Sequence, residues 1–445
     1  MKGRVIRPTF WMLVALTLSL PVQALATNGM YLAGYGSEAA GRGGANIAVA
    51  DGALGLQANP AGIARLDGQH LGVALQLLAP SLQFRYAGDS SGKAMDGEGK
   101  IFPMPALSYA RGGKDAKWAW GLGLISQGGM GATFKKFSTP FGTTDETFSE
   151  VRYMALTPTV AYNVTPALSL GLSANVGYSD VQFRFWPNTS FYSDGGTPDD
   201  RSDDMGFFGA DLADRAWALN YGVRAGVMWA ANERVQLGAI YHSRIEGDYE
   251  NGTLRLDMSS LGLGDVDYDA TVSGFTWPEQ LGVGAQVRPA DRWLVAADLK
   301  FYRWSEAIEL IEVKGTNPSN PSSPLATVRM PFTFLWEDQW VYALGAEYKA
   351  TEPLTLRAGY NYGASPVPDA TLNPLFPATT RHHITVGAGY AWDGNGVHLA
   401  VERAFEASQT NTNVDQNVNP FGPGATVAHS QWTVSLGFSK AFGRK

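Results

Sequence analysis

The sequence contains 445 residues, no cysteine and a formal net charge of −7. This negative balance disfavours nucleic acid as a partner, because such a partner requires a basic face. Glycine occurs 52 times, and the chain carries 13 Trp, 18 Tyr and 21 Phe. The longest apolar run lies at the N-terminus and is shorter than the roughly 20 residues that a transmembrane helix requires. Abundant glycine and aromatic residues without long apolar runs are typical of a β-barrel in an outer membrane.

The first 26 residues predict a secretory signal peptide. Basic residues near the start precede an apolar core at residues 10–20, and Ala24-Leu25-Ala26 supplies a small-residue cleavage site. The core is too short for the alternative, a membrane anchor. We therefore expect residues 1–26 to be removed and the mature chain to begin at Thr27.

Residues 27–67 show neither the periodicity of a helix nor the alternation of a strand. The segment is rich in glycine, which allows tight turns and close packing, and it ends in Asn59-Pro60-Ala61. Pro60 favours extended geometry at Asn59, whose side chain can hydrogen-bond to nearby backbone. We predict that residues 27–67 form an N-terminal hatch that plugs the barrel. A flexible periplasmic tail is the alternative.

From residue 68 the chain alternates between apolar and small polar residues. In the last predicted strand, Trp432 and Leu436 point to one side and Thr433 and Ser435 to the other. In a membrane barrel the apolar side faces lipid and the small polar side lines the lumen. The predicted strands are 68–85, 101–112, 117–132, 150–164, 166–184, 215–231, 233–247, 271–289, 291–308, 336–350, 352–364, 380–393, 395–408 and 430–442.

Short turns alternate with long loops between these strands, and the long loops fall near 86–100, 133–149, 185–214, 248–270, 309–335, 365–379 and 409–429. An even strand count with this sorting of loop lengths is the signature of an outer-membrane barrel. The predicted fold is therefore all-β: a 14-stranded antiparallel transmembrane β-barrel over residues 68–445, plugged by the N-terminal hatch.

In this order of elements the chain resembles the FadL/TodX family, outer-membrane transporters for long-chain fatty acids and other hydrophobic compounds. The residues that carry the resemblance are Gly41-Arg42, Asp51, Asn59-Pro60-Ala61, Trp277-Pro278-Glu279-Gln280, Asp291-Arg292-Trp293, Trp304-Ser305, Leu356-Arg357-Ala358-Gly359 and Ser365-Pro366-Val367-Pro368. The likeness covers essentially the whole mature chain. It departs at the end, where Phe442 is followed by Gly443-Arg444-Lys445, because such barrels usually finish on an aromatic residue.

The resemblance implies passive transport of hydrophobic molecules. Apolar outer loops would catch the substrate, a pocket in the barrel would receive it, and it would leave sideways through a kink in the third strand while the hatch rearranges. The hatch and gate residues would be Gly41, Arg42, Asp51, Asn59, Pro60 and Ala61. Gly128, Gly129 and Gly131 lie in the third predicted strand, where glycine marks a bulge or bend that could open the wall. Barrel curvature without function is the alternative.

Ligand contacts are expected from apolar side chains near the outer rim. The candidates are Phe134, Phe137, Phe141, Phe207, Phe208, Leu261 and Leu263. Mutual burial within the loops is the alternative for them. A substrate carboxylate could pair with lumen-facing Arg224 or Arg357, since arginine offers two matched donors. We favour the other interpretation, in which these arginines pair with the hatch or with the lumen acids Asp298, Glu347 and Glu402.

Other functions are weaker matches to the sequence. A general diffusion porin is the alternative function, but a porin needs an open lumen rather than a plug. No histidine lies in a recognisable nucleophile motif, so we expect neither an enzyme nor a cofactor. We expect no metal site, because the alternating Asp265, Asp267 and Asp269 fit a solvated rim better than a calcium site. The expected partners are a hydrophobic small molecule, the lipid bilayer and lipopolysaccharide, around a monomer that crosses the bacterial outer membrane many times.

Overall fold

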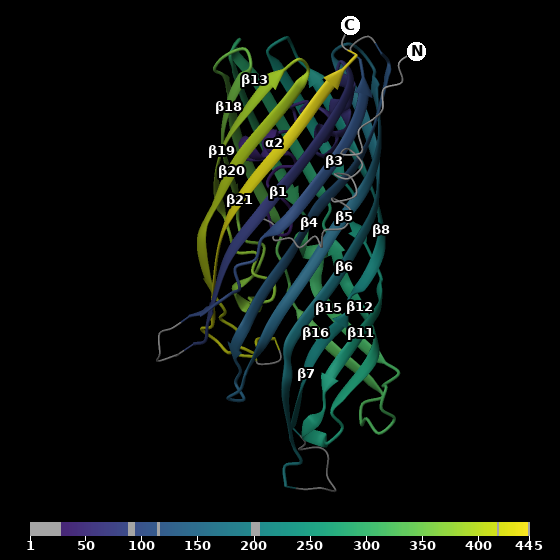
Figure 1. Ribbon diagram of the computed structural model, residues 1–445, viewed down its shortest axis with the longest axis vertical. Helices are drawn as coiled ribbons and strands as arrows, with labels where there is room; N and C mark the ends of the chain where they lie inside the picture. The colour runs from purple at the N-terminus through teal and green to yellow at the C-terminus, as the bar shows by residue number, and fades with distance from the viewer. Residues whose placement is uncertain (1–27, 88–93, 114–115, 197–204, 416–417, 444–445) are drawn as a thin grey trace, which may run out of the picture.

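The computed structural model describes residues 28–87, 94–113, 116–196, 205–415 and 418–443, so the predicted signal peptide lies outside the described residues. These residues form one antiparallel sheet of 21 strands that closes into a tall barrel (Figure 1). Within this part of the chain, the structure contains no helix of the length and apolar character needed to cross a membrane.

The strands are β1 (Gly68–Arg85), β2 (Met95–Asp96), β3 (Phe102–Gly112), β4 (Trp118–Ser138), β5 (Thr144–Asn163), β6 (Leu168–Ser193), β7 (Met205–Asp214), β8 (Ala216–Ala230), β9 (Val235–His242), β10 (Ile245–Glu246), β11 (Tyr249–Asp257), β12 (Asp265–Trp277), β13 (Gln280–Ala290), β14 (Trp293–Tyr302), β15 (Ile308–Thr316), β16 (Thr327–Thr333), β17 (Gln339–Lys349), β18 (Leu354–Gly363), β19 (His382–Trp392), β20 (Asn395–Thr410) and β21 (Thr426–Phe442). The helical turns are α2 (Ser37–Gly41), η1 (Ala53–Gln57), η2 (Pro60–Arg65), η4 (Ser259–Leu261), η5 (Trp304–Glu306) and η6 (Asp369–Thr371).

Pairing of the first strand with the last closes the barrel. β1 and β21 are aligned from Gln69 opposite Phe442 to Arg85 opposite Thr426. The closed circuit of pairings runs through β1, β3, β4, β5, β6, β8, β9, β13, β14, β17, β18, β19, β20 and β21. We call the half of the barrel in which β21 ends the proximal half, and the opposite half, which contains β7 and β11, the distal half (Figure 1).

The expected count of fourteen strands is wrong for the sheet as a whole. Segments predicted as long loops contain β7, β11, β16 and much of β12 and β15, which extend the distal wall. The predicted strand 271–289 divides at Pro278 into β12 and β13. The physical reason is that these distal strands place apolar side chains inside the barrel and charged ones outside, whereas the expected pattern places apolar side chains outside. In β12, Val266 and Tyr268 are buried, whereas Asp265 and Asp269 are exposed.

The proximal half follows the predicted alternation. Leu436 and Trp432 of β21 are about half exposed on the outside, while Thr433 and Ser435 are buried toward the lumen. The N-terminal segment, residues 28–67, lies against the inner wall on both sides of the circuit. Its α2 contacts β18, β19, β20 and β21, and its η2 contacts β3, β4, β5, β6 and β8. The segment therefore crosses the lumen of the proximal half.

Candidate functional site

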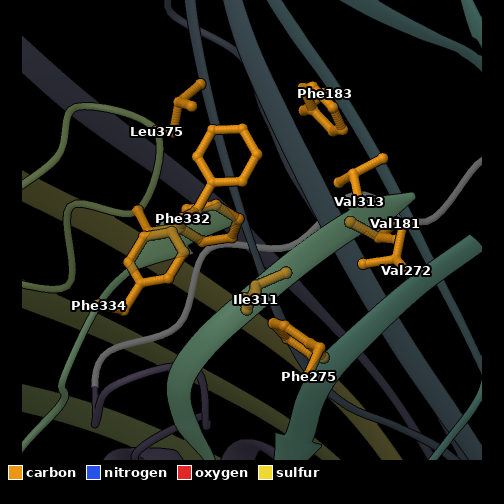
Figure 2. Close-up of a pocket in the computed structure, with 10 residues that line it drawn as sticks. Val181, Phe183, Val272, Phe275, Ile311, Val313, Phe332, Phe334 and Leu375 are labelled. Atoms are coloured by element: carbon orange, nitrogen blue, oxygen red, sulfur yellow. The ribbon is translucent and has the colours of Figure 1, made fainter. Parts of the chain in front are cut away.

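An apolar pocket lies in the distal half of the barrel (Figure 2). It is lined by Val181 and Phe183 of β6, Val272 and Phe275 of β12, Ile311 and Val313 of β15, Phe332 of β16, and by Phe334, Leu375 and Phe376 from loops. Every lining side chain is apolar. The cavity volume is about 20 Å³, which matches one water molecule. An acyl chain or an aromatic ring would therefore have to displace these side chains to enter.

An aromatic cluster connects this pocket to the N-terminal segment. The ring of Trp277 lies 6.1 Å from Phe275, 4.8 Å from Tyr153 and 5.3 Å from Tyr31, measured between ring centroids. Tyr31 belongs to the N-terminal segment, so Trp277 connects the start of that segment to the pocket-lining residue Phe275. Gly29 has a φ of +66°, and a Cβ atom there would lie 2.5 Å from the Trp304 ring. Only glycine fits this position without displacing the ring.

The pairing between β3 and β4 is incomplete. It runs from Arg111 opposite Trp120 to Ala106 opposite Ile125 and stops there, although both strands continue. Pro103 and Pro105 follow in β3, and proline has no N–H to donate to a ladder. The pairing of β4 with β5 also shifts register between Ser126 and Gly128.

The N-terminal segment occupies the place where β3 leaves β4. Tyr31 forms an isolated antiparallel bridge with Gly128, and Gly129 N donates to Met30 O at 3.0 Å. A Cβ atom on Gly128 would lie 2.2 Å from Met30 O, so glycine is required for this approach. Of the three glycines predicted at an opening, Gly128 and Gly129 lie at this interruption. Gly131 pairs regularly with Glu150 of β5.

Arg42 anchors the N-terminal segment to the wall. Its buried guanidinium donates to Asp51 within the segment and to Glu347 of β17. The Nε of Arg357 donates to the same Glu347 carboxylate at 3.2 Å. Burial raises the pKa of Asp51, and the adjacent Arg42 opposes that rise. The segment reaches the wall at Gly41, whose carbonyl accepts a hydrogen bond from Thr385 Oγ1 at 3.0 Å.

The Asn59-Pro60-Ala61 motif forms a second anchor at the start of η2. Asn59 Oδ1 accepts from Ala61 N at 3.0 Å and caps the helical turn. Its Nδ2 donates to Ile47 O at 2.9 Å and to Val227 O of β8 at 3.0 Å. Gly171 of β6 is the wall residue that this motif approaches. A Cβ atom there would lie 2.2 Å from Ala61 N, so the close approach requires glycine.

The predicted ligand-binding apolar residues occupy different environments. Phe134 and Phe137 are buried, and Phe137 lies 5.0 Å from the Phe84 ring and 6.0 Å from the Trp186 ring. Phe141 is 41 % exposed and lies 4.8 Å from Phe207. Phe207, Phe208, Leu261 and Leu263 are half-buried. Phe134 and Phe137 thus bury each other, while Phe141 remains accessible at the distal end.

The two predicted arginines differ in their partners. Arg357 forms an ion pair with Glu347, as the favoured interpretation expects. Arg224 donates to Gln57 O at 3.2 Å and to the Gln127 side chain, both neutral groups. The other predicted lumen acids are engaged elsewhere: Asp298 accepts from Asn46 N at 2.8 Å, and Glu402 lies 3.1 Å from His383.

Sequence reasoning missed the residues that line the apolar pocket. Val181, Phe183, Val272 and Val313 lie in segments that were predicted to be loops or strand ends. A usable signal was present, because apolar residues alternate with charged ones in β12 and β15. The alternation alone did not show that these apolar side chains point into the barrel, because the pattern expected for a membrane barrel places apolar residues on the outside.

A known protein family matches almost the whole chain. Residues 18–442 match the family described as "Outer membrane protein transport protein (OMPP1/FadL/TodX)". Outer membrane protein P1 of Haemophilus influenzae is 26% identical over 252 residues, which are 53% of this chain and 51% of that protein. The 47 kDa outer membrane protein of Pasteurella multocida is 27% identical over 185 residues, which are 39% of this chain and 41% of that protein. The chain thus spans about half the length of these curated relatives or less.

Solved structures share the fold over nearly the whole chain. The toluene transporter TodX of Pseudomonas putida superposes with a TM-score of 0.73 at 20% identity, covering 93% of this chain and 100% of that one. A FadL homologue of Pseudomonas aeruginosa gives a TM-score of 0.72 at 18% identity, covering 93% and 100%. The chain belongs to the outer membrane protein transport protein family (OMPP1/FadL/TodX) and is a β-barrel protein of the outer membrane.

Proposed function

We propose that this protein is a passive channel for hydrophobic molecules, either long-chain fatty acids or hydrocarbons, with residues 27–67 acting as a hatch and with a lateral exit beside Gly128. The observation that carries the proposal is the unfinished pairing of β3 with β4, which Tyr31 and Met30 complete in place of β3. A gap closed by a separate segment can open without breaking the ladder between two wall strands.

The proposed route starts at the distal end, which we assign to the outside of the cell. Exposed apolar side chains such as Phe141 would collect the substrate, and the apolar pocket would receive it. Substrate entering the pocket would press on Trp277 and, through it, on Tyr31. Release of Tyr31 from Gly128 would then open the wall toward the membrane. Such a route needs no energy source and keeps an apolar solute out of the aqueous periplasm.

The alternative, a general diffusion porin, is the weaker match. The proximal lumen is crossed by the N-terminal segment, whose residues 28–34 and 37–49 are almost entirely buried. The family likeness also favours a transporter over an enzyme. A monomeric state and contact with lipopolysaccharide remain part of the proposal.

The test is uptake in cells that lack their own transporter for hydrophobic compounds. Cells expressing the full chain receive labelled oleate, labelled toluene and a labelled small sugar in separate assays. Uptake of oleate or toluene without the sugar is the expected result, and the preferred compound identifies the substrate. Free passage of the sugar, with no gain for either hydrophobic compound, would mean that the protein is a porin.

A further inference from the structure

Residues 364–381 connect β18 to β19 and fold back into the barrel. We call this segment the strap. From Pro374 to Thr380 every residue is buried, and Leu375 is only 1 % exposed. Four residues of the strap are prolines, which have no N–H to donate to a β ladder. The strap is therefore a part of the distal interior that is buried without being a strand of the wall.

The strap crosses the distal lumen. Leu375 O accepts a hydrogen bond from Ser149 Oγ of β5. This strand stands opposite β18, because six strands separate β5 from β18 in either direction around the described circuit. Beside this contact, Pro377 O lies 2.9 Å from His429 Nδ1 of β21. A segment that begins at β18 and contacts β5 spans the space between the two walls.

The base of the strap is attached to parts of the chain that lie next to β17 and β20. Glu337 N donates to Pro366 O at 2.7 Å, and Asn411 Nδ2 donates to Leu372 O at 2.9 Å. The tip, residues 374–377, meets side chains of the more distant strands β5 and β21 instead. The tip can therefore leave these strands while the base stays in place.

The tip also closes the apolar pocket of the distal half. Leu375 and Phe376 line this pocket (Figure 2). Its lining residues on β6, β12 and β15 belong to paired strands, so moving them would break ladder hydrogen bonds. Leu375 and Phe376 belong to no strand, and a hydrogen bond from a serine to a carbonyl can be exchanged for one to water at small cost. A cavity of about 20 Å³ can therefore grow to the size of a ligand most readily when the tip moves.

We propose that the strap is a second gate of the channel, which closes the apolar pocket to substrate arriving from the distal end and opens when its tip leaves Ser149. The inference rests on the proposed transport function and adds a second moving part to the hatch. Because the prolines restrict the backbone of the strap, the tip moves as a stiff unit about the base. A substrate in the pocket is then enclosed by the strap on one side and by the aromatic contacts of the N-terminal segment on another.

The first test fixes the tip to the wall. Ser149→Cys with Leu375→Cys places two thiols in a chain that has no other cysteine, and a short, reversible bifunctional thiol reagent joins them. Cross-linking should reduce the uptake of oleate and toluene by cells to background, and a reductant that cleaves the link should restore it. Thr143→Cys with Thr189→Cys is the control, because these hydroxyl oxygens lie 3.0 Å apart in the distal wall. Its uptake should not change on cross-linking.

The second test follows the position of the tip without measuring transport. Leu375→Cys is labelled with a polar maleimide that is added outside the cells, and its burial should make labelling slow. Addition of Ser149→Ala should raise the labelling rate about two- to tenfold, the effect of losing one neutral hydrogen bond. Ser173→Ala, which removes a hydrogen bond to Thr159 within the wall, is the control for loss of a buried serine.

Two results would show that the strap is not a gate while leaving the proposed function intact. One is uptake by the cross-linked Ser149–Leu375 variant that equals uptake by its reduced form. The other is a labelling rate that Ser149→Ala leaves unchanged. If the wild type takes up neither oleate nor toluene, the proposed function is wrong, and the labelling rate decides by itself whether the tip moves. The mobility shift of the unheated barrel in electrophoresis verifies that each variant is folded.

Discussion

Strand β5 runs through both halves of the barrel, and the two halves place apolar and polar side chains on opposite faces of the wall. In the proximal half, Thr157 is buried toward the lumen and Leu156 is 41 % exposed on the outside. In the distal half, Val151 is buried inside, and the neighbouring Arg152 on the other face forms an ion pair with Asp180. β6 changes in the same way, with Ser173 inside the proximal half and Phe183 inside the distal half.

This difference in side-chain placement indicates which environment surrounds each half of the barrel and which kind of group each half can enclose. An apolar outer face is stable in lipid, whereas a charged one requires water or lipid head groups. The polar inner wall of the proximal half supplies hydrogen bonds to a segment with little regular structure, as Thr385 and Asn361 do for the carbonyls of Gly41 and Gly43. The pocket in the distal half is lined by apolar side chains alone and suits a hydrophobic solute.

Fixing the N-terminal segment to the proximal wall should have the largest effect on transport. Ser37 Oγ of α2 lies 2.9 Å from Ser435 Oγ of β21, close enough for a disulfide after Ser37→Cys and Ser435→Cys, and the chain has no other cysteine. Oxidation should reduce uptake to background, because the hatch cannot rearrange, and a reductant should restore it. Thr159→Cys with Ser173→Cys, which joins two wall strands at a 2.8 Å contact, is the control. Unchanged uptake by the oxidised Ser37–Ser435 variant would show that α2 stays in place during transport.

A charge on the outer face should separate the two halves by stability. Leu172 is 54 % exposed on the proximal outer face, and we expect Leu172→Arg to lower the free energy of unfolding by about 2–4 kcal/mol if it lies near the bilayer centre. Thr271→Arg on the exposed outer face of distal β12 should change it by less than about 0.5 kcal/mol. Urea titration of the barrel in lipid vesicles measures both. Equal losses at the two positions would mean that the membrane extends over the distal half.

The same reversal explains which features could be predicted from the sequence. In β21 the alternation correctly predicts which side faces lipid, because apolar residues point outward in the proximal half. Trp432 and Leu436 lie on the outside, and Thr433 and Ser435 lie toward the lumen. The distal strands were predicted as loops, because aspartates at 265, 267 and 269 on an outer face look like solvated loop residues when the lipid rule is applied. Alternation identifies a strand, but it does not identify which side is inside.

Some of the candidate site residues were predictable because the backbone at their position requires a particular residue type. Gly128 was found because an interior glycine marks an irregular strand, but the prolines of β3 that end the neighbouring pairing were not considered. Arg224 and Arg357 could not be distinguished, since both alternate toward the lumen. Their difference lies in one acidic partner. Glu347 lies directly opposite Arg357 in the pairing of β17 with β18 and forms an ion pair with it, whereas Arg224 donates to neutral groups.

Filling the distal pocket should reduce uptake by a smaller amount. Val313→Phe adds a ring to a cavity of about 20 Å³, and overpacking of this kind costs about 1–3 kcal/mol, so we expect a roughly five- to hundredfold lower affinity for the substrate. Val283→Phe makes the same change on the lipid-facing side of β13, where the side chain is 55 % exposed, and should have no effect. Concentration dependence of oleate and toluene uptake distinguishes affinity from maximal rate. Equal uptake by both variants would place the binding site elsewhere in the barrel.

Restoring a hydrogen-bond donor to β3 should give the smallest effect and tests the gap itself. Continued in its present register, the pairing of β3 with β4 would place Pro105 opposite Ser126. Pro105→Val supplies an N–H, and one new ladder bond contributes about 0.5–1.5 kcal/mol toward the closed wall, so uptake should fall roughly two- to tenfold. Pro158→Val in β5, at an exposed position of the wall away from the gap, controls for loss of a proline. Because the substitution should strengthen the barrel while it slows transport, a rise in thermal stability together with lower uptake would support a lateral exit, and a rise in stability with unchanged uptake would show that substrate leaves by another path.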